Sequence, residues 1–188
     1  MSTNYPSDNR TKERFDLAGN APSAWLMTAD FLLAGARVLI REFQSPNMDL
    51  PIGSLIPIEE KLLPSAFLLY GFALENLMKA LLLKKSDRKF AIDGKLKLEN
   101  IDRHDLSLLA QQADFYVSEE EKLVLSSLST KLVSSARYPV GKNWEKHRLR
   151  QYPNGGFGSQ TSFNSGDIPM IEAMVKRLIE ELGYDDLI

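Results

Sequence analysis

The stretch LLPSAFLLYGFALENLMKALLL, residues 62–83, decides the fold of this chain. Up to Glu75 it is apolar on nearly every face of a helix, and such a helix lies among several neighbours rather than on a surface. Its uncharged run, Leu62 to Leu74, is 13 residues long, whereas a membrane-spanning helix needs about 18 or more apolar residues. The stretch therefore predicts the central helix of a helical bundle and no membrane association. The side chains expected in its core are Phe67, Leu74, Leu77, Leu81 and Leu82.

Glu75 and Lys79 interrupt this apolar helix and allow two interpretations. A carboxylate among apolar side chains costs free energy unless it is paired. In the first interpretation the two residues form an ordinary surface pair at i,i+4 spacing, which contributes a few tenths of a kcal/mol. In the second, Glu75 meets a basic group from another helix, for which Arg137 is the candidate.

Periodicity and end signals elsewhere predict four further helices. Asp-Gly between two alternating runs predicts a small β-hairpin within residues 89–100. Polar composition indicates a flexible N-terminal arm over residues 1–20 and a long mobile loop over residues 152–167. The fold class expected is all-α, a bundle of about five helices in one domain over residues 21–188. The expected helices are Pro22–Phe43, Glu59 or Pro64 to Lys85, Asp102–Asp114, a helix that opens with a capping box of Ser118 and Glu121 and ends at Pro139, and one from Asp167 with Gly183 just past its end.

Composition excludes several classes of protein. The 188 residues are 44% hydrophobic and 26% charged, as in an ordinary soluble globule. A net charge of −2 gives no overall attraction to nucleic acid, so such contact would require a local basic patch. The absence of cysteine excludes disulfides and thiolate metal sites. The polar N-terminus lacks an apolar signal core, so the expected location is cytoplasmic.

Cofactor and metal motifs are not found. The glycine-rich GGFGSQTSFNSG lacks the Gly-Lys-Ser/Thr ending of a phosphate-binding loop and follows no predicted strand. His104 and Asp105 are adjacent, so they would point to different sides of a helix, and His147 has no second histidine at helical spacing. No Gly-x-Ser-x-Gly motif marks a serine nucleophile. We therefore expect no cofactor and no metal.

The densest group of chemically active side chains lies in SSARYPVGKNWEKHRLR, residues 134–150. Within residues 142–150, four cations against Glu145 give a local charge of +3 (four positive, one negative), and two aromatic rings lie in or beside this run. Cations bind phosphates and aromatic rings stack on bases, so the stretch is a candidate RNA-binding site. The alternative is a solvated run of charge. The cations are Lys142, Lys146, Arg148 and Arg150, and the rings are those of Trp144 and Tyr138.

Four motifs in this order resemble those of the HEPN-like helical bundles, particularly uncharacterised bacterial members: FALENLMKALLL (72–83), HDLSLLAQQA (104–113), SEEEKLVLSSLS (118–129) and ARYPV (136–140). The resemblance covers roughly residues 60–140. It implies an antiparallel all-α bundle and a homodimer. Many HEPN domains are metal-independent ribonucleases of toxin–antitoxin and phage-defence systems, while others bind nucleotides, partner a nucleotidyltransferase or have no known activity.

The resemblance also implies site residues. The family's ribonuclease motif is Arg, four to six residues, then His, often with a polar residue after the Arg. KNWEKH matches it with Lys142 in place of Arg, Asn143 as the polar residue and His147 as the histidine. His147 would act as general acid or base, and Lys142 or Arg137 would stabilise charge on the phosphate. His104 is the next candidate; its alternative role is a structural hydrogen bond to local backbone or to a neighbouring helix.

Three functional hypotheses follow. The first is a HEPN-like protein that acts on or binds RNA or nucleotides in a toxin or phage-defence setting, with an antitoxin or a nucleotidyltransferase as partner. The second is a non-catalytic helical module for dimerisation or protein interaction. The third, a metal or cofactor bundle, has almost no support in the sequence. We expect any activity to depend on the segment from Arg137 to His147.

Overall fold

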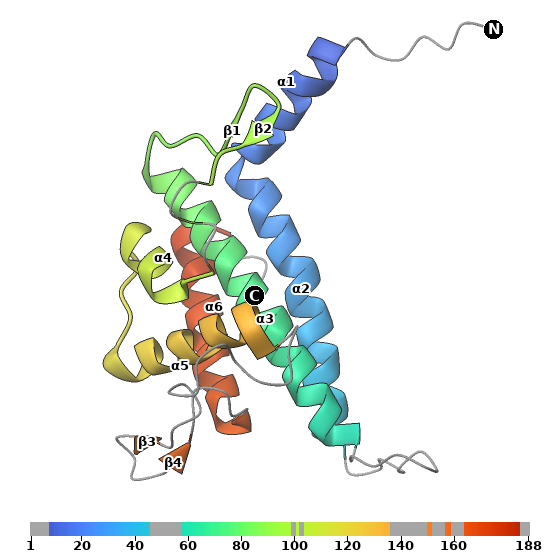
Figure 1. The fold of residues 1–188 in the computed structure, drawn as a ribbon, viewed down its shortest axis with the longest axis vertical. Coiled ribbons are helices and arrows are strands. Elements are labelled where there is room, and N and C mark those ends of the chain that lie inside the picture. The colour runs from blue at the N-terminus through green and yellow to red at the C-terminus, as the bar shows by residue number, and fades with distance from the viewer. Residues whose placement is uncertain are drawn as a thin grey trace, which may run out of the picture.

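The computed structural model describes residues 8–45, 58–98, 101, 104–135, 150–151, 157–158 and 164–184. Within these ranges the chain forms six α-helices, and the prediction of an all-α bundle with a small hairpin is confirmed (Figure 1). The elements are α1 Asp8–Gly19, α2 Pro22–Phe43, α3 Ile58–Lys85, β1 Ala91–Ile92, β2 Lys95–Leu96, α4 Leu106–Gln112, α5 Glu119–Thr130, a π-helical turn η1 Lys131–Ser135, β3 Arg150–Gln151, β4 Phe157–Gly158, a 3₁₀ turn η3 Ser165–Asp167, and α6 Ile168–Leu182.

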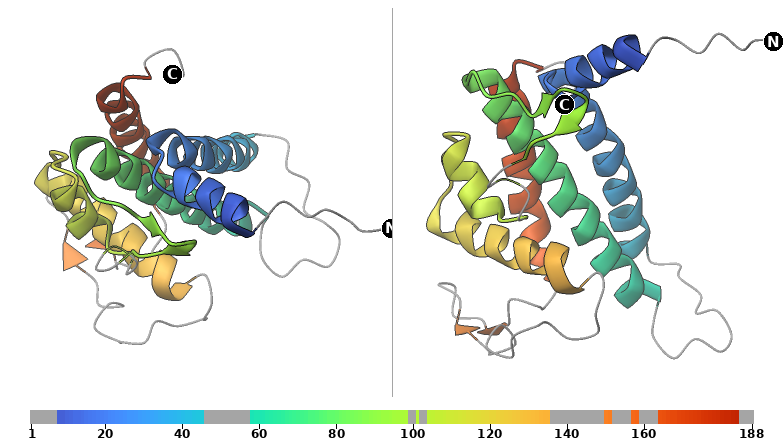
Figure 2. Two further views of the ribbon diagram at one scale, coloured as in Figure 1. Left: turned by 90° about the horizontal axis from the view of Figure 1, so that it is seen from above. Right: turned by 45° about the horizontal axis from the view of Figure 1, so that its top comes forward.

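Helix α3 is the centre of the bundle, as its composition predicts. Helices α2, α4, α5 and α6 all pack against it, and Figure 2 shows them arranged around its length. The five side chains predicted to form its core are between 0% and 2% exposed. Most side chains of α3 from Ala66 to Leu83 are buried, so most of its apolar surface is satisfied inside the protein.

Helix α2 and the hairpin form where the sequence predicts them. Pro22 occupies the first turn of α2, where its missing N–H costs nothing. The two turn residues of the hairpin, Asp93 and Gly94, have φ values of 57° and 72°, the left-handed pair that a two-residue type I′ turn requires. Trp25 of α2 packs edge-on against Phe90 beside β1, with 5.6 Å between the ring centroids, so the hairpin is attached to the bundle.

Helix α1 replaces much of the flexible arm expected over residues 1–20. It is a largely exposed helix that rests on the hairpin. Asn20, directly after α1, accepts hydrogen bonds from the backbone N–H groups of Phe90 and Ala91 and donates to the carbonyl of Ala91. Gly19 is in such close contact that a Cβ atom there would lie 2.5 Å from the Cβ of Ala91. The polar sequence of α1 shows no core-facing stripe because its partner is the hairpin, about seventy positions away.

Helix α4 is shorter than the predicted Asp102–Asp114. It begins at Leu106 because His104 has a φ of 54°, a left-handed conformation that no helix continues through, and because Asp105 caps the helix by accepting the N–H of Leu108. The predicted helix starting after Ser118 has its capping box with Glu121. Its α-helical part, α5, ends at Thr130, and the expected end at Pro139 lies outside the described residues. At the other end of the chain, Gly183 follows α6 with a φ of 76°, as predicted.

Among the residues that the structure describes, two helices satisfy length and hydropathy criteria for a membrane-spanning segment. They are α2 and the Leu62–Lys85 part of α3. In the most apolar window of α3, 78% of the residues are buried within the bundle, which is the pattern of a core helix. In the corresponding window of α2 the buried share is only 28%. Trp25, Leu32, Leu39 and Phe43 pack partly buried against the core, whereas Met27, Phe31 and Val38 are exposed.

Truncating Leu77 to alanine tests the central position of α3. Leu77 is fully buried, so Leu77→Ala removes buried methyl groups and leaves a cavity, and we expect it to lower the free energy of unfolding by about 2–5 kcal/mol. Urea denaturation followed by circular dichroism measures this change. A loss well below 1 kcal/mol would show that α3 is peripheral in solution.

Candidate functional site

Most of the predicted site lies outside the described residues. This applies to Arg137, Tyr138, Lys142, Asn143, Trp144, Lys146, His147 and Arg148. Arg150 is in β3, where it pairs with Gly158 of β4. His104 is the one candidate histidine in the part of the chain that the structure describes, and its surroundings define the site.

His104 is bound to Glu75, the acid that interrupts the central helix. The imidazole Nδ1 lies 2.8 Å from Oε2 of Glu75. The glutamate is 4% exposed, whereas the histidine side chain is 34% exposed, so the pair has one end in the core and the other at the surface. A carboxylate only accepts hydrogen bonds, so Nδ1 of His104 carries the proton and Nε2 is left as the acceptor in the neutral ring.

Lys79 occupies the second oxygen of Glu75. Its Nζ lies 2.5 Å from Oε1, and both side chains of this pair are almost completely buried. The ammonium also lies 5.4 Å from the centroid of the Trp25 ring, a cation–π distance. The interpretation of Glu75 and Lys79 as a surface pair is therefore wrong. Glu75 does meet a basic group from another segment, but that group is His104, and the expected partner Arg137 is outside the described residues.

The backbone around His104 fixes the position of its ring. A φ of 54° is uncommon for a residue with a side chain, and conformations of this kind concentrate at functional sites, where the surrounding structure holds them. The N–H of Leu106 donates to Oγ of Ser129, 2.9 Å away, which ties the start of α4 to α5. The Phe72 ring on α3 packs edge-on to the imidazole at a centroid distance of 6.0 Å. The histidine is thus held by contacts with α3, and its turn is fixed by the bond from Leu106 to α5.

This arrangement provides a positioned acid–base group. A histidine whose Nδ1–H is held by a carboxylate has a fixed tautomer and ring orientation, and its Nε2 is available to take or give a proton. Lys79 balances the charge of Glu75, which lets that carboxylate remain in a low-dielectric position. Because Lys79 is buried and already paired, it is not placed to bind a phosphate itself.

Two open hollows lie among residues next to the site, although neither is lined by His104, Glu75 or Lys79 themselves. One, of about 320 Å³, lies between α1, α2, α3 and β2 and is lined by Trp25 and Asn76, the neighbours of Lys79 and Glu75. The other, of about 730 Å³, follows the α4–α5 connection from Asp105, next to His104, to Tyr116. Among the described residues, no group of three or more His, Asp or Glu side chains is placed to hold a metal ion.

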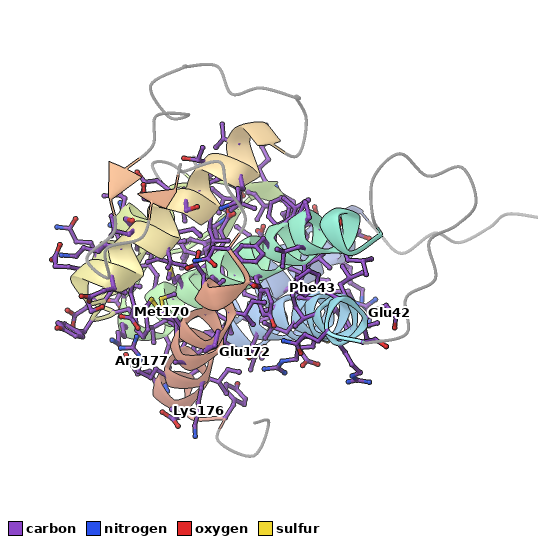
Figure 3. All side chains as sticks on the ribbon, turned by 90° about the horizontal axis from the view of Figure 1, so that it is seen from below. Glu42, Phe43, Met170, Glu172, Lys176 and Arg177 are labelled. Carbon is purple, nitrogen blue, oxygen red and sulfur yellow. The ribbon has the colours of Figure 1, made fainter. Side chains whose placement is uncertain are left out.

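A second ionic cluster joins three helices away from His104. Arg37 of α2 binds Glu172 of α6 through Nε and Nη2, and the buried Tyr70 of α3 donates its hydroxyl to Oε1 of the same glutamate, 2.5 Å away. Figure 3 shows Glu172 on the side of α6 that borders α2. Burial and the hydrogen bond to Glu172 raise the pKa of Tyr70, so its phenol stays protonated and this cluster acts as a clamp.

Lys131, the first residue of η1, is the second buried cation among the described residues, after Lys79. It is 2% exposed, contacts Ser127, and lies 5.3 Å from the centroid of the Phe67 ring. Burial lowers its pKa from the ordinary 10.5 to about 8, an effect that the charge of Asp167 partly offsets. Folding therefore favours loss of its proton.

Sequence reasoning placed the site at His147 and gave His104 second place. No local pattern joins His104 to Glu75, because they are 29 positions apart. The signal that could have found the pair is compositional. Glu75 needed a partner inside the bundle, and only two histidines exist in the chain.

Comparison with known proteins adds no relative. No family model matches the chain, and neither the curated proteins nor the solved structures contain a match.

Removing the carboxylate of Glu75 tests whether the pair is buried. Glu75→Ala leaves Lys79 as a buried charge without its carboxylate, so we expect a loss of about 3–5 kcal/mol in the free energy of unfolding. Glu180→Ala is the matched control, because Lys176 and Glu180 form an exposed pair at the same i,i+4 spacing; its expected loss is below about 0.5 kcal/mol. Equal losses in the two variants would contradict the buried site.

The pH dependence of stability tests Lys131. Because its folded pKa is about 8 and its unfolded value is 10.5, the unfolded chain binds more protons between these values. Stability therefore rises with pH across this window, by at most about 3 kcal/mol, and the penalty of the buried charge is fully present below pH 8. We expect Lys131→Met to remove this rise in denaturation curves measured at a series of pH values. A variant with the same slope as the wild type would contradict the lowered pKa.

Proposed function

We propose that this chain acts on RNA or nucleotides through phosphodiester chemistry, with His104 as its acid–base residue. The observation that carries the proposal is the hydrogen bond from Nδ1 of His104 to the buried carboxylate of Glu75. This bond leaves Nε2 of the partly exposed ring as the acceptor nitrogen. The Phe72 ring and the backbone turn also hold the imidazole in place. The basic stretch around residues 142–150 and the HEPN-like order of motifs favour RNA as the substrate class.

The reaction proposed is attack of a ribose 2′-hydroxyl on the adjacent phosphorus. Nε2 of His104 takes the hydroxyl proton as the oxygen–phosphorus bond forms. The bond to the 5′-oxygen breaks, and that oxygen leaves with a proton from a second acid, for which His147 is the candidate. The products are a 2′,3′-cyclic phosphate and a 5′-hydroxyl, and the step needs neither an oxidant nor a metal ion.

The charge that develops on the phosphate requires a cation. Lys79 is committed to Glu75, so we propose that Arg137 or Lys142 supplies it. The hydrogen bond between Leu106 and Ser129 holds the start of α4 beside the C-terminal part of α5. Arg137 follows the end of η1 by two positions in the sequence, so the cationic segment comes soon after the helix that is tied to the His104 turn.

The two histidines can be separated experimentally. Purified protein is incubated with end-labelled RNA, with and without EDTA, and compared with His104→Asn and His147→Asn. Asparagine tolerates a positive φ and its amide can still donate to Glu75, so His104→Asn removes Nε2 with little disturbance of the fold. We expect this variant to lose at least about 100-fold in cleavage rate, and EDTA to have no effect.

The alternative results are equally specific. Full activity in His104→Asn with loss in His147→Asn would return the site to residues 137–147 and leave His104 a structural role. If the protein binds RNA without cutting it, Lys142→Ala and Arg148→Ala should weaken binding and reduce its salt dependence.

A second candidate function is a non-catalytic helical interaction module. The exposed apolar side chains Met27, Phe31 and Val38 of α2 favour it. If the wild-type protein neither cleaves nor binds RNA, that result would select this candidate. The partner would then be an antitoxin, a nucleotidyltransferase or another copy of the chain.

A further inference from the structure

Helix α2 carries a second apolar stripe that no described part of the chain covers. Met27, Phe31 and Val38 are 56%, 67% and 57% exposed, and Ala34 between them is exposed as well. At 100° per residue this stripe lies roughly 150° around the helix from the core-facing one. The core-facing stripe consists of Leu26, Ala29, Leu33, Ala36 and Ile40.

The position of α2 makes this stripe accessible. The helix forms one edge of the bundle, with α3 and α6 on its inner side (Figure 1). Three large apolar side chains in one row are more than the single exposed residues that ordinary surfaces carry, and contiguous patches of this kind mark interaction sites.

The spacing of the stripe fits a second copy of the same helix. Its members follow one another at intervals of 4, 3 and 4 residues, the spacing of a helix–helix seam, and this series reads the same in both directions. In an antiparallel pair related by a two-fold axis midway between Leu32 and Leu33, Phe31 of each copy lies opposite Ala34 of the partner subunit, and Met27 lies opposite Val38 of the partner subunit. A large ring then meets a small side chain at the two central positions, as interdigitated packing requires.

The charges beside the stripe agree with this pairing. Asp30 and Arg37 lie on the same side of the stripe. The two-fold axis places this side of one helix next to the same side of the partner helix. At 1.5 Å per residue, Asp30 lies only about 3 Å along the axis from the partner's Arg37, within the reach of an arginine side chain. Arg37 is 44% exposed even though it binds Glu172, so it can also face a second copy.

A membrane surface fits this stripe less well. Interfacial helices carry an excess of Lys and Arg beside their apolar face. Helix α2 has two cations, Arg37 and Arg41, and two anions, Asp30 and Glu42, so its net charge is zero.

We propose that two copies of this chain associate through an antiparallel pair of α2 helices, with Phe31 packed against Ala34 of the partner subunit. This proposal is independent of the chemistry assigned to His104, and it identifies the face, the direction and the register of the homodimer.

Sedimentation velocity over about 1 to 100 µM tests the association, a range suited to an interface of modest area. We expect wild-type protein to approach the dimer mass at the upper end. Phe31→Glu should raise the dissociation constant at least about 30-fold, the effect of losing a central anchoring side chain, with an unchanged circular dichroism spectrum. Tyr116→Glu is the matched control: Tyr116 is an aromatic residue, 77% exposed, on the α4–α5 connection, and its replacement should leave the dimer intact.

A size exchange tests the register. Phe31→Ala alone should weaken the dimer by removing the ring, and Ala34→Phe alone by placing two rings opposite each other. The double variant Phe31→Ala/Ala34→Phe restores one large and one small side chain at each central position, so we expect its dissociation constant to return to within about threefold of wild type, well inside one factor of ten.

Three results would overturn the proposal: a monomer at the highest concentration, a dimer insensitive to Phe31→Glu, or a double variant no tighter than its single parents. Sedimentation of monomeric wild-type protein with anionic phospholipid vesicles, lost in Phe31→Glu, would assign the stripe to a membrane surface instead. None of these measurements uses RNA, so their outcome is separate from the test of His104.

Discussion

The need to bond both oxygens of the buried Glu75 carboxylate is the constraint on which the rest of the structure depends. The carboxylate lies in the most apolar helix of the chain, where an ionised group is stable only if its oxygens are bonded. Lys79 takes one oxygen and His104 takes the other. The ammonium of Lys79 in turn lies close to the ring of Trp25. One buried charge therefore sets the positions of a residue on α2, a residue one turn along α3, and the turn that starts α4.

This constraint explains why an otherwise ordinary turn has an uncommon backbone. His104 can reach Glu75 only from outside α4, because a helical residue at that point would direct its side chain along the helix surface. The left-handed φ places the imidazole toward α3, and the cap of Asp105 with the bond from Leu106 to Ser129 stabilises the turn. The strain of one residue is thus offset by a satisfied buried charge, and the same geometry leaves one imidazole nitrogen for chemistry.

Two further groups of ionic contacts join helices of the bundle. Glu172 joins α6 to α2 and α3 through Arg37 and Tyr70, while Arg177 of α6 binds Glu121 in the capping box of α5. Each contact links helices that the apolar core brings together but does not orient. Apolar packing tolerates rotation of a helix more readily than a bidentate ion pair does, so these contacts fix which face of each helix is turned inward.

The sequence by itself determined the elements that depend on neighbouring residues. The extent of α2, the central position of α3, the Asp-Gly turn, the capping box at Ser118 and the end of α6 all follow from side chains within a few positions of one another, because helix periodicity, caps and turns are local. Only the tertiary structure decided the rest. Helix α1 needs the hairpin, His104 needs Glu75, and the exposure of Phe31 depends on which face of α2 meets α3. Each of these joins groups distant in sequence or chooses between two apolar faces of one helix, and a local pattern contains no information about which distant group will share a buried environment.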